Sequence, residues 1–327
     1  MAHILVTGGA GYIGSHTALA LIDAGWQPVI IDNLVTGKRE LIPDGADFIE
    51  GDISDSKLVR STLQKYNCRA VLHFAGSTVV PESVSDPLKY YENNTCASRS
   101  LIESVVAANV EAMIFSSTAA VYGDPDTLPI SEDLPAAPIN PYGVSKLMTE
   151  WMLRDVAAAT SLRYVALRYF NVAGADPQGR SGQMTPEATH LIKVACQAAC
   201  GTRDSITIFG DDYDTEDGTG VRDYIHVSDL ADAHVAALAY LLDGGESTIM
   251  NCGYGRGYSV KQVVDMVGAV AGVEMPVIMG PRRPGDSGAV YASSDRIRKT
   301  LGWAPQYDDL ETIVTSAYKW EQKINAA

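Results

Sequence analysis

The chain opens with a glycine-rich turn between an apolar run and a stretch of helical character, and this turn most restricts the possible fold. The run Ile4–Val6 predicts a buried strand, and Gly8, Gly11 and Gly14 follow it. Glycines at this spacing allow a tight turn, close approach of the backbone to a pyrophosphate, and close packing of a helix on a strand. The amphipathic stretch 15–24 predicts that helix, whose N-terminus would face phosphate charge. These features predict a dinucleotide-binding site.

An acidic residue ends the next predicted strand. That strand, Pro28–Ile31, leads directly into Asp32, whose carboxylate can accept hydrogen bonds from both hydroxyls of an adenosine ribose. The same carboxylate would repel a 2′-phosphate, so it favours NAD over NADP. An ordinary turn would explain a glycine triplet alone. A triplet between two strands and followed by Asp32 predicts that NAD is the cofactor.

Strands and helices alternate through the first half of the chain. Further strands are predicted at residues 48–53, 70–74, 113–117 and 164–169, with a helix over residues 55–66 and a long helix that opens at Asp86 and Pro87. This alternation is typical of an α/β fold, a Rossmann-like doubly wound parallel sheet. Beyond Asn171 the alternation fails. We therefore expect a NAD-binding domain over residues 1–170 and a smaller α/β substrate-binding lobe over residues 171–327, from which segments can return to the first domain.

A tyrosine and a lysine lie on a predicted helix that follows a strand ending at Thr118. Tyr142 and Lys146 would share one helix face, so the ammonium charge could stabilise the phenolate. We expect this charge to lower the pKa of the phenol from its reference value of about 10. Such a phenol is an acid/base for a hydroxyl group, and NAD could take up the hydride when an alcohol is oxidised. For the two residues taken alone, an exposed helix pair without a catalytic role is the alternative.

The composition argues against some partners. The net charge of −15 and the pI near 4.7 disfavour nucleic acid and anionic membranes. The cysteines form an odd set without a CxxC pair or a histidine cluster at zinc-ligand spacing, so we expect reduced thiols and no metal. They are Cys68, Cys96, Cys196, Cys200 and Cys252. With no signal peptide before the first strand and no apolar run of membrane-spanning length, the expected location is the cytoplasm.

Several motifs occur in an order that resembles the UDP-glucose 4-epimerase family, a group of extended short-chain dehydrogenases/reductases. They are Thr7–His16, Asp32–Leu34, Gly51–Ile53, Phe74–Gly76, Ser116–Thr118, Val121–Gly123, the pair Tyr142 and Lys146, Arg168–Asn171 and Asp217–Val227. The last block is highly specific to that family. The resemblance runs from Ile4 to about Trp320, and it implies an NAD-dependent isomerase that interconverts UDP-hexoses through a transient 4-keto sugar. It also implies a homodimer.

The resemblance assigns roles to the residues that match the family's motifs. Thr118, Tyr142 and Lys146 would be catalytic, and Tyr142 and Lys146 would also contact the cofactor. The other cofactor contacts would be Gly8, Gly11, Tyr12, Ile13, Gly14, Asp32, Asn33, Leu34, Val35, Thr36, Gly37, Asp52, Ile53, Phe74, Ala75, Gly76, Asn93 and Phe170. The substrate contacts would be Thr118, Tyr142, Asn171, His190, Leu191, Phe209, Arg222, Arg283, Asp286 and Val290. Arginines suit a diphosphate because their planar fork binds its oxygens in pairs.

Three positions bear on affinity and specificity within this resemblance. Thr78 stands where many members carry a lysine that touches the cofactor phosphates, so a point charge is missing. His190 stands where some members carry asparagine, and a purely structural histidine is an equal alternative there. Val290 falls at the family's gate beside the sugar, where a tyrosine narrows the pocket. Valine should admit an N-acetyl group at C2, unless a one-residue slip places Tyr291 at the gate.

The residues after Thr118 distinguish among the reactions of this scaffold. The 4,6-dehydratases place an Asp-Glu pair directly after the threonine, whereas this chain has Ala119 and Ala120. Neither alanine can move a proton, so a 4-keto sugar can only be reduced again, and reduction on the opposite face gives the epimer. Another nucleotide-sugar epimerase or reductase of the same family stays open. In a different class, an NAD-sensing regulator also stays open, although it would be expected to lose Tyr142 or Lys146.

Overall fold

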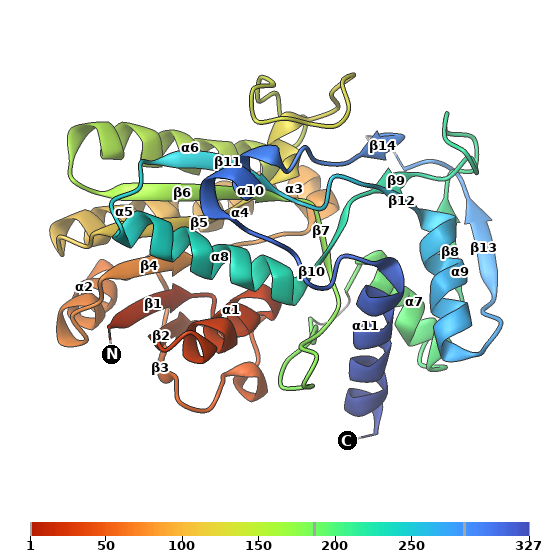
Figure 1. Cartoon of the computed structure of the whole chain (residues 1–327), viewed down its shortest axis with the longest axis horizontal. Helices are drawn as coiled ribbons and strands as arrows, with labels where there is room; N and C mark the ends of the chain where they lie inside the picture. The colour runs from red at the N-terminus through yellow and green to blue at the C-terminus, as the bar shows by residue number, and fades with distance from the viewer. Residues whose placement is uncertain (1, 186–187, 284–285, 327) are drawn as a thin grey trace.

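The computed structural model describes residues 2–185, 188–283 and 286–326. Within those ranges a parallel sheet of seven strands forms the centre of the fold, in the order β11-β6-β5-β4-β1-β2-β3 (Figure 1). The strands are β1 (His3–Thr7), β2 (Gln27–Asp32), β3 (Asp47–Glu50), β4 (Ala70–His73), β5 (Ala112–Thr118), β6 (Arg163–Tyr169) and β11 (Thr248–Cys252). The direction of winding reverses between β1 and β4, as in a doubly wound sheet. The fold class predicted from the sequence is confirmed.

Helices cover both faces of this sheet. One face carries α1 (Tyr12–Asp23) and α8 (Val227–Leu242), and the other carries α2 (Ser56–Lys65), α5 (Ala97–Ala107) and α6 (Pro141–Ala159). Side chains alternate along a strand, so Ile4 and Val6 join the cluster under α1 and α8, while Leu5 joins the cluster on the opposite face. This two-sided burial explains why β1 is a continuous apolar run.

The second lobe is built from short strands and three helices. Its strands pair as β10 (Tyr224–His226) with β7 (Asn171–Ala173), β13 (Val277–Gly280) with β8 (Ile206–Phe209), and β12 (Tyr258–Ser259) and β14 (Ala289–Val290) with β9 (Val221–Arg222). The helices are α7 (Leu191–Ala199), α9 (Val260–Ala271) and α11 (Leu310–Asn325). Both β11 and α8 pack within the first domain although they follow residue 171 in sequence. The predicted domain boundary itself stays a prediction.

The remaining elements are short. They are α3 (Val80–Ser85), α4 (Pro87–Tyr90), α10 (Asp295–Leu301), the 3-10 turns η1 (Arg39–Leu41) and η3 (Ala119–Tyr122), and the π-helical segment η2 (Tyr91–Cys96). Asp86 caps α4 as its sequence suggested, because its carboxylate accepts a hydrogen bond from the Lys89 backbone amide at 3.3 Å. The long helix predicted from Asp86 is not regular, however, since the π-helical η2 separates α4 from α5.

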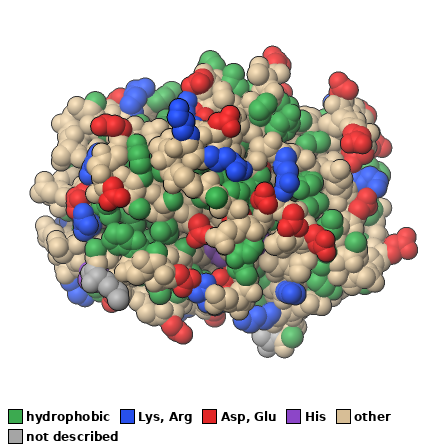
Figure 2. All heavy atoms as spheres, viewed as in Figure 1, with side chains coloured by type: hydrophobic (Ala, Val, Ile, Leu, Met, Phe, Trp, Pro, Cys, Tyr) green, Lys and Arg blue, Asp and Glu red, His purple; other side chains and the backbone are tan. Residues whose placement is uncertain are grey.

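The surface is mixed in charge. Figure 2 shows acidic and basic side chains interspersed over one face of the molecule, with apolar side chains between them. None of the helices in the described ranges has the length and apolar content needed to cross a bilayer.

The glycine turn gives a stability prediction. A Cβ atom on Gly14 would lie 2.2 Å from the Gly8 carbonyl oxygen, whereas a Cβ on Gly11 would lie 3.2 Å from the same oxygen. We expect Gly14→Ala to lower the free energy of unfolding by about 1–3 kcal/mol, because the backbone must move apart. Gly11→Ala, the matched control, should cost much less. Urea unfolding followed by circular dichroism measures both, and equal midpoints for the two variants would refute this account.

Candidate active site

Three residues predicted to be catalytic meet at the carboxyl end of β5. Thr118 is the last residue of that strand, and Asn140 caps the first turn of α6 by accepting a hydrogen bond from the Gly143 amide at 2.9 Å. This cap, with Pro141 in the first helical position, starts the helix just before Tyr142. The Tyr142 phenol then lies near the Thr118 hydroxyl, whose hydrogen bond would favour the phenolate.

Lys146 lies one helical turn after Tyr142 and is buried. Its Nζ donates a hydrogen bond to the Ser116 carbonyl oxygen at 3.1 Å and lies 5.1 Å from the centre of the Phe115 ring. Burial lowers the pKa of this ammonium to about 8. The ammonium is therefore held by backbone and aromatic groups of β5, at the strand end where Thr118 lies.

The expected low pKa of the Tyr142 phenol is wrong. Burial raises the pKa of this group above its usual value, and the hydrogen bond with Thr118 lowers it only in part. The physical reason is desolvation, which disfavours a buried phenolate more than a single hydrogen bond favours it. At neutral pH the phenol therefore keeps its proton, and the Lys146 ammonium is directed at a carbonyl oxygen of the strand.

The glycine turn fits a dinucleotide. A Cβ on Gly8 would lie 2.6 Å from the Ala75 amide nitrogen, so the turn after β1 and the loop after β4 touch through their backbones. A Cβ on Gly11 would meet only the Gly8 carbonyl oxygen within 4 Å, which leaves the outer side of the turn open to a ligand. Asp32 accepts hydrogen bonds from the amides of Ala10 at 3.0 Å and Leu34 at 2.8 Å. Burial raises the pKa of this carboxyl above its usual value, and the hydrogen bonds from the two amides offset only part of that rise.

The loop after β2 carries backbone strain at a predicted cofactor contact. Leu34 has φ of 59°, a left-handed conformation that is uncommon for a residue other than glycine. Its neighbour Asn33 donates a hydrogen bond to Asp52 at 2.7 Å, which joins the ends of β2 and β3. Burial opposes ionisation of Asp52, but hydrogen bonds from Ser54 and Asn33 outweigh it and lower the pKa. Ile53 is buried beside this pair.

The other predicted cofactor residues line neighbouring strand ends. Phe74 packs against His234 with ring centres 4.7 Å apart, and a Cβ on Gly76 would lie 3.6 Å from Lys146 Nζ. Asn93 of η2 donates a hydrogen bond at 3.0 Å to Ser77, which lies in the loop after β4. These contacts bring the loop after β4 close to α6, the helix that carries Tyr142 and Lys146. The predicted roles of the individual residues, including Ile13, Val35, Thr36 and Gly37, stay predictions.

Tyr12 has a structural contact that the sequence did not indicate. Its phenol donates a hydrogen bond to the Gly174 carbonyl oxygen at 2.6 Å, directly after β7 of the second lobe. On the next turn of α1, His16 Nε2 accepts a hydrogen bond from the Asp176 amide at 3.1 Å. The first turns of the cofactor helix are therefore joined to the strand that begins at Asn171.

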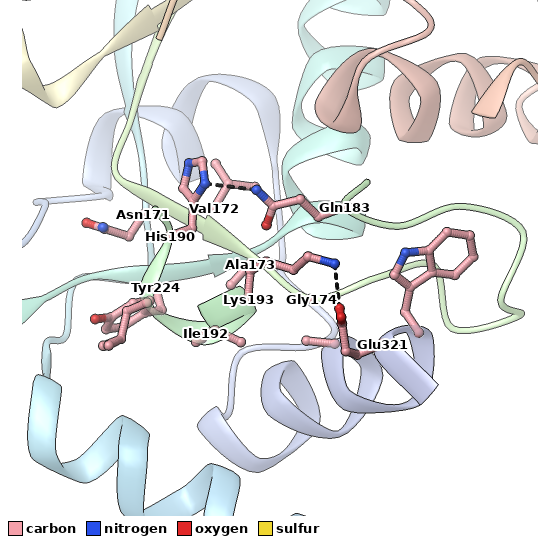
Figure 3. Close-up of a pocket in the computed structure, with 13 residues that line it drawn as sticks. Asn171, Val172, Ala173, Gly174, Gln183, His190, Ile192, Lys193, Tyr224 and Glu321 are labelled. Atoms are coloured by element: carbon pink, nitrogen blue, oxygen red, sulfur yellow. Dashed lines mark hydrogen bonds and ion pairs between the residues drawn. The ribbon is translucent and has the colours of Figure 1, made fainter. Parts of the chain in front are cut away.

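The predicted substrate residues fall into two groups. Asn171, His190 and Leu191 line one small cavity of about 20 Å³ in the second lobe (Figure 3). In the other group, the Arg283 guanidinium lies 3.9 Å from the centre of the Phe209 ring. The Asp286 amide donates a hydrogen bond to the Arg283 carbonyl oxygen at 3.2 Å.

Strand β14 connects the second group to the catalytic helix. Val290 pairs with Arg222 across the β14–β9 ladder. It also packs, with Phe170, against a buried cluster that includes Leu147, the residue after Lys146. Val290 and Phe170, a predicted cofactor contact, therefore pack against one buried cluster beside α6.

Among the residues that the structure describes, no group of three or more histidine, cysteine, aspartate or glutamate side chains is arranged to hold a metal ion. All five cysteines are free, as expected.

Comparisons with known proteins identify the family of this chain. The model of the NAD dependent epimerase/dehydratase family matches residues 4–253. A UDP-glucose 4-epimerase from Azospirillum brasilense is 58% identical over 98% of this chain and 92% of that protein. The chain belongs to the UDP-glucose 4-epimerases. It is an isomerase with NAD as its cofactor, so the family and cofactor predicted from the sequence are confirmed.

Solved structures of UDP-glucose 4-epimerases share the whole fold. The enzyme from Brucella ovis, solved in complex with NAD, superposes with a TM-score of 0.95 at 47% identity and covers 98% of this chain and 99% of its own. The UDP-Glc/GlcNAc 4-epimerase from Campylobacter jejuni superposes with a TM-score of 0.87 at 47% identity and covers 99% of this chain and 100% of its own.

Sequence reasoning missed the buried ion pair that holds the catalytic helix of this epimerase. Glu150 and Arg168 are both buried, and the carboxylate also accepts a hydrogen bond from the Ser117 hydroxyl. The Arg168 guanidinium lies 4.7 Å from the centre of the Tyr122 ring. One signal was available: Glu150 follows Lys146 by one turn on the same helix face, and a carboxylate facing a sheet needs a partner.

This pair gives a second stability prediction. Arg168→Met leaves the Glu150 carboxylate buried without its partner, so we expect a loss of about 3–5 kcal/mol in the free energy of unfolding. The double variant with Glu150→Gln should recover at least about half of that loss, because no charge is then buried. The control is Arg154→Met, which removes an exposed arginine of α6, the helix that carries Glu150. It should leave the unfolding midpoint unchanged. Additive losses in the double variant would contradict this account.

Proposed function

We propose that this chain interconverts UDP-glucose and UDP-galactose, with Tyr142 as the acid/base, Thr118 as its hydrogen-bond partner and Lys146 as the neighbouring cation. One observation carries the proposal: the Tyr142 phenol, near the Thr118 hydroxyl, lies at the same edge of the sheet as the glycine turn and Asp32. Bound there, NAD supplies a ring that takes up and returns a hydride, and its positive charge favours the phenolate.

The chain's own residues handle the proton and the substrate. Tyr142 takes the proton of the sugar 4-hydroxyl and later returns one to the 4-keto oxygen, while the Thr118 hydroxyl orients the reacting oxygen. Arg222 and Arg283 hold the diphosphate, and the keto-hexose turns about its link to that diphosphate before it is reduced on the opposite face. Arg283 is oriented for this role by stacking on Phe209.

The residues after Thr118 favour epimerisation over elimination. Ala119 and Ala120 begin the turn η3, and neither side chain can move a proton. A 4-keto sugar in this site therefore has no acid or base for loss of water.

The test uses the purified chain with UDP-galactose and no added NAD. We expect UDP-glucose to form until equilibrium with bound NAD present at the end as at the start, because the cofactor is regenerated in each turnover. Product chromatography and the absorbance of reduced cofactor measure both. Stoichiometric consumption of NAD or NADPH would favour a reductase of the same family instead.

Tyr142→Phe tests the role of the phenol. Loss of a general acid/base should lower kcat by roughly two orders of magnitude or more, while binding of UDP changes little. Steady-state kinetics and calorimetric titration with UDP separate the two effects. Near-normal turnover would show that Thr118 or water carries the proton.

Substrate breadth depends on Val290. Its packing against the same buried cluster as Phe170 and its pairing with Arg222 support a position beside the sugar. The Tyr291 ring lies toward Gly257, since a Cβ on Gly257 would be 3.6 Å from that ring. Successive side chains of an extended chain point to opposite sides, which favours a direction for Tyr291 opposite to that of Val290.

We expect activity on UDP-N-acetylglucosamine and UDP-N-acetylgalactosamine as well as on the plain hexoses, and selective loss of the activity on the acetamido sugars in Val290→Tyr. Wild-type protein active on UDP-galactose yet inert toward both acetamido sugars would refute the gate.

The chain also acts as a homodimer. Val84, Leu88 and Trp151 are 64%, 76% and 47% exposed on α3, α4 and α6, which pack together, and an exposed apolar face of this kind favours association. Light scattering should give twice the chain mass of 35.0 kDa, and a monomer would refute the dimer.

The five free thiols fit a reducing compartment, which supports the cytoplasm as the location of this protein.

A further inference from the structure

A glutamine and a histidine of the second lobe form a pair that the reaction as described does not use. Gln183 lies in the loop after β7 and is buried, whereas His190 directly precedes the first turn of α7 and is exposed. The Gln183 amide nitrogen lies 2.8 Å from His190 Nδ1, and both residues line the small cavity with Asn171 (Figure 3).

This contact determines where the imidazole carries its proton. An amide nitrogen can only donate a hydrogen bond, so Nδ1 must accept, and in a neutral ring the proton then lies on Nε2. His190 is exposed, and partial desolvation by the protein around it lowers its pKa, so the ring is neutral near pH 7. His190 therefore presents one N–H donor on the side away from Gln183.

The charged groups around the cavity do not oppose this state. Lys193, one turn further along α7, forms a buried ion pair with Glu321 of α11, and their charges compensate each other (Figure 3). Tyr224 of β10 also lines the cavity, and burial raises the pKa of its phenol, so it is uncharged at neutral pH. Among the described residues that line this cavity, no unpaired charge faces the imidazole.

We propose that Gln183 is a positioning residue that holds His190 as a neutral Nε2–H donor to an oxygen atom of the UDP-sugar. The inference rests on the proposed function, since it takes the ligand from there. A fixed histidine tautomer offers only a donor at this place, whereas an amide side chain offers both a donor and an acceptor. Asn171 supplies such an amide on the same cavity wall.

The decisive variant is Gln183→Glu, which keeps the shape and exchanges the donor for an acceptor. A carboxylate requires a proton on His190 Nδ1, so a neutral ring would turn the lone pair of Nε2 toward the ligand oxygen. At high pH the KM for UDP-galactose should rise by about tenfold. As the pH falls toward about 6, the imidazolium paired with the introduced carboxylate regains both N–H donors, and KM should approach the wild-type value.

The comparison variants separate this role from others. Wild-type KM should stay flat over the same pH range, and so should that of Gln178→Glu, which adds the same charge to an exposed position of the same loop. Gln183→Leu should raise KM without a pH dependence. In a His190→Phe background, Gln183→Glu should no longer make the KM for UDP-galactose depend on pH. A KM that does not change with pH in Gln183→Glu would overturn the proposal.

Two further measurements do not depend on turnover. Nitrogen-15 NMR of the wild-type imidazoles, assigned with His190→Phe, should show His190 protonated at Nε2, and protonation at Nδ1 would overturn the proposal. Binding of UDP-glucose in a Tyr142→Phe background should show the same pH dependence in affinity that KM shows. A failure of epimerase activity with a correct tautomer would therefore contradict the proposed function and not the pairing.

Discussion

The placement of the reacting groups depends on the buried ion pair between the catalytic helix and the sheet. The Glu150 carboxylate binds both the Arg168 guanidinium in β6 and the Ser117 hydroxyl in β5, directly before Thr118. These buried polar groups are all satisfied in only one relative position of α6 and the two strands. Apolar side chains of similar volume could bury as much surface, but they would allow the helix to slide. The pair therefore explains why Tyr142 faces Thr118 and not a neighbouring position.

A second set of contacts joins cofactor and substrate binding. The strand β7 starts at Asn171, a predicted substrate contact, and ends just before Gly174, whose carbonyl oxygen accepts the Tyr12 phenol. His16, one turn further along α1, accepts a hydrogen bond from the backbone amide of Asp176, in the loop that follows β7. The helix predicted to face the cofactor phosphates and the strand predicted to contact the nucleotide thus belong to one hydrogen-bonded unit. Movement of either would have to break buried hydrogen bonds, which is costly.

The sequence predicted what is local and periodic. The sheet was predictable because strands such as Ile4–Val6 are buried on both faces and therefore apolar throughout. Tyr142 and Lys146 were recognisable because helical spacing alone puts them together. The partner of Glu150 could not be predicted in this way, because it comes from a strand whose position depends on the whole sheet. The hydrogen bond between Gln183 and His190 depends likewise on the path of an irregular loop.

The protonation states of Tyr142 and Lys146 explain why neither acts alone. Burial raises the pKa of the phenol and lowers that of the ammonium to about 8, so the site disfavours each charge in isolation. The positive charge of bound NAD would favour the phenolate. Proton uptake by Tyr142 is therefore coupled to positive charge beside it, and the phenol becomes a base only when the site supplies that charge. The helical spacing identifies the pair, but the depth of its burial decides when it can react.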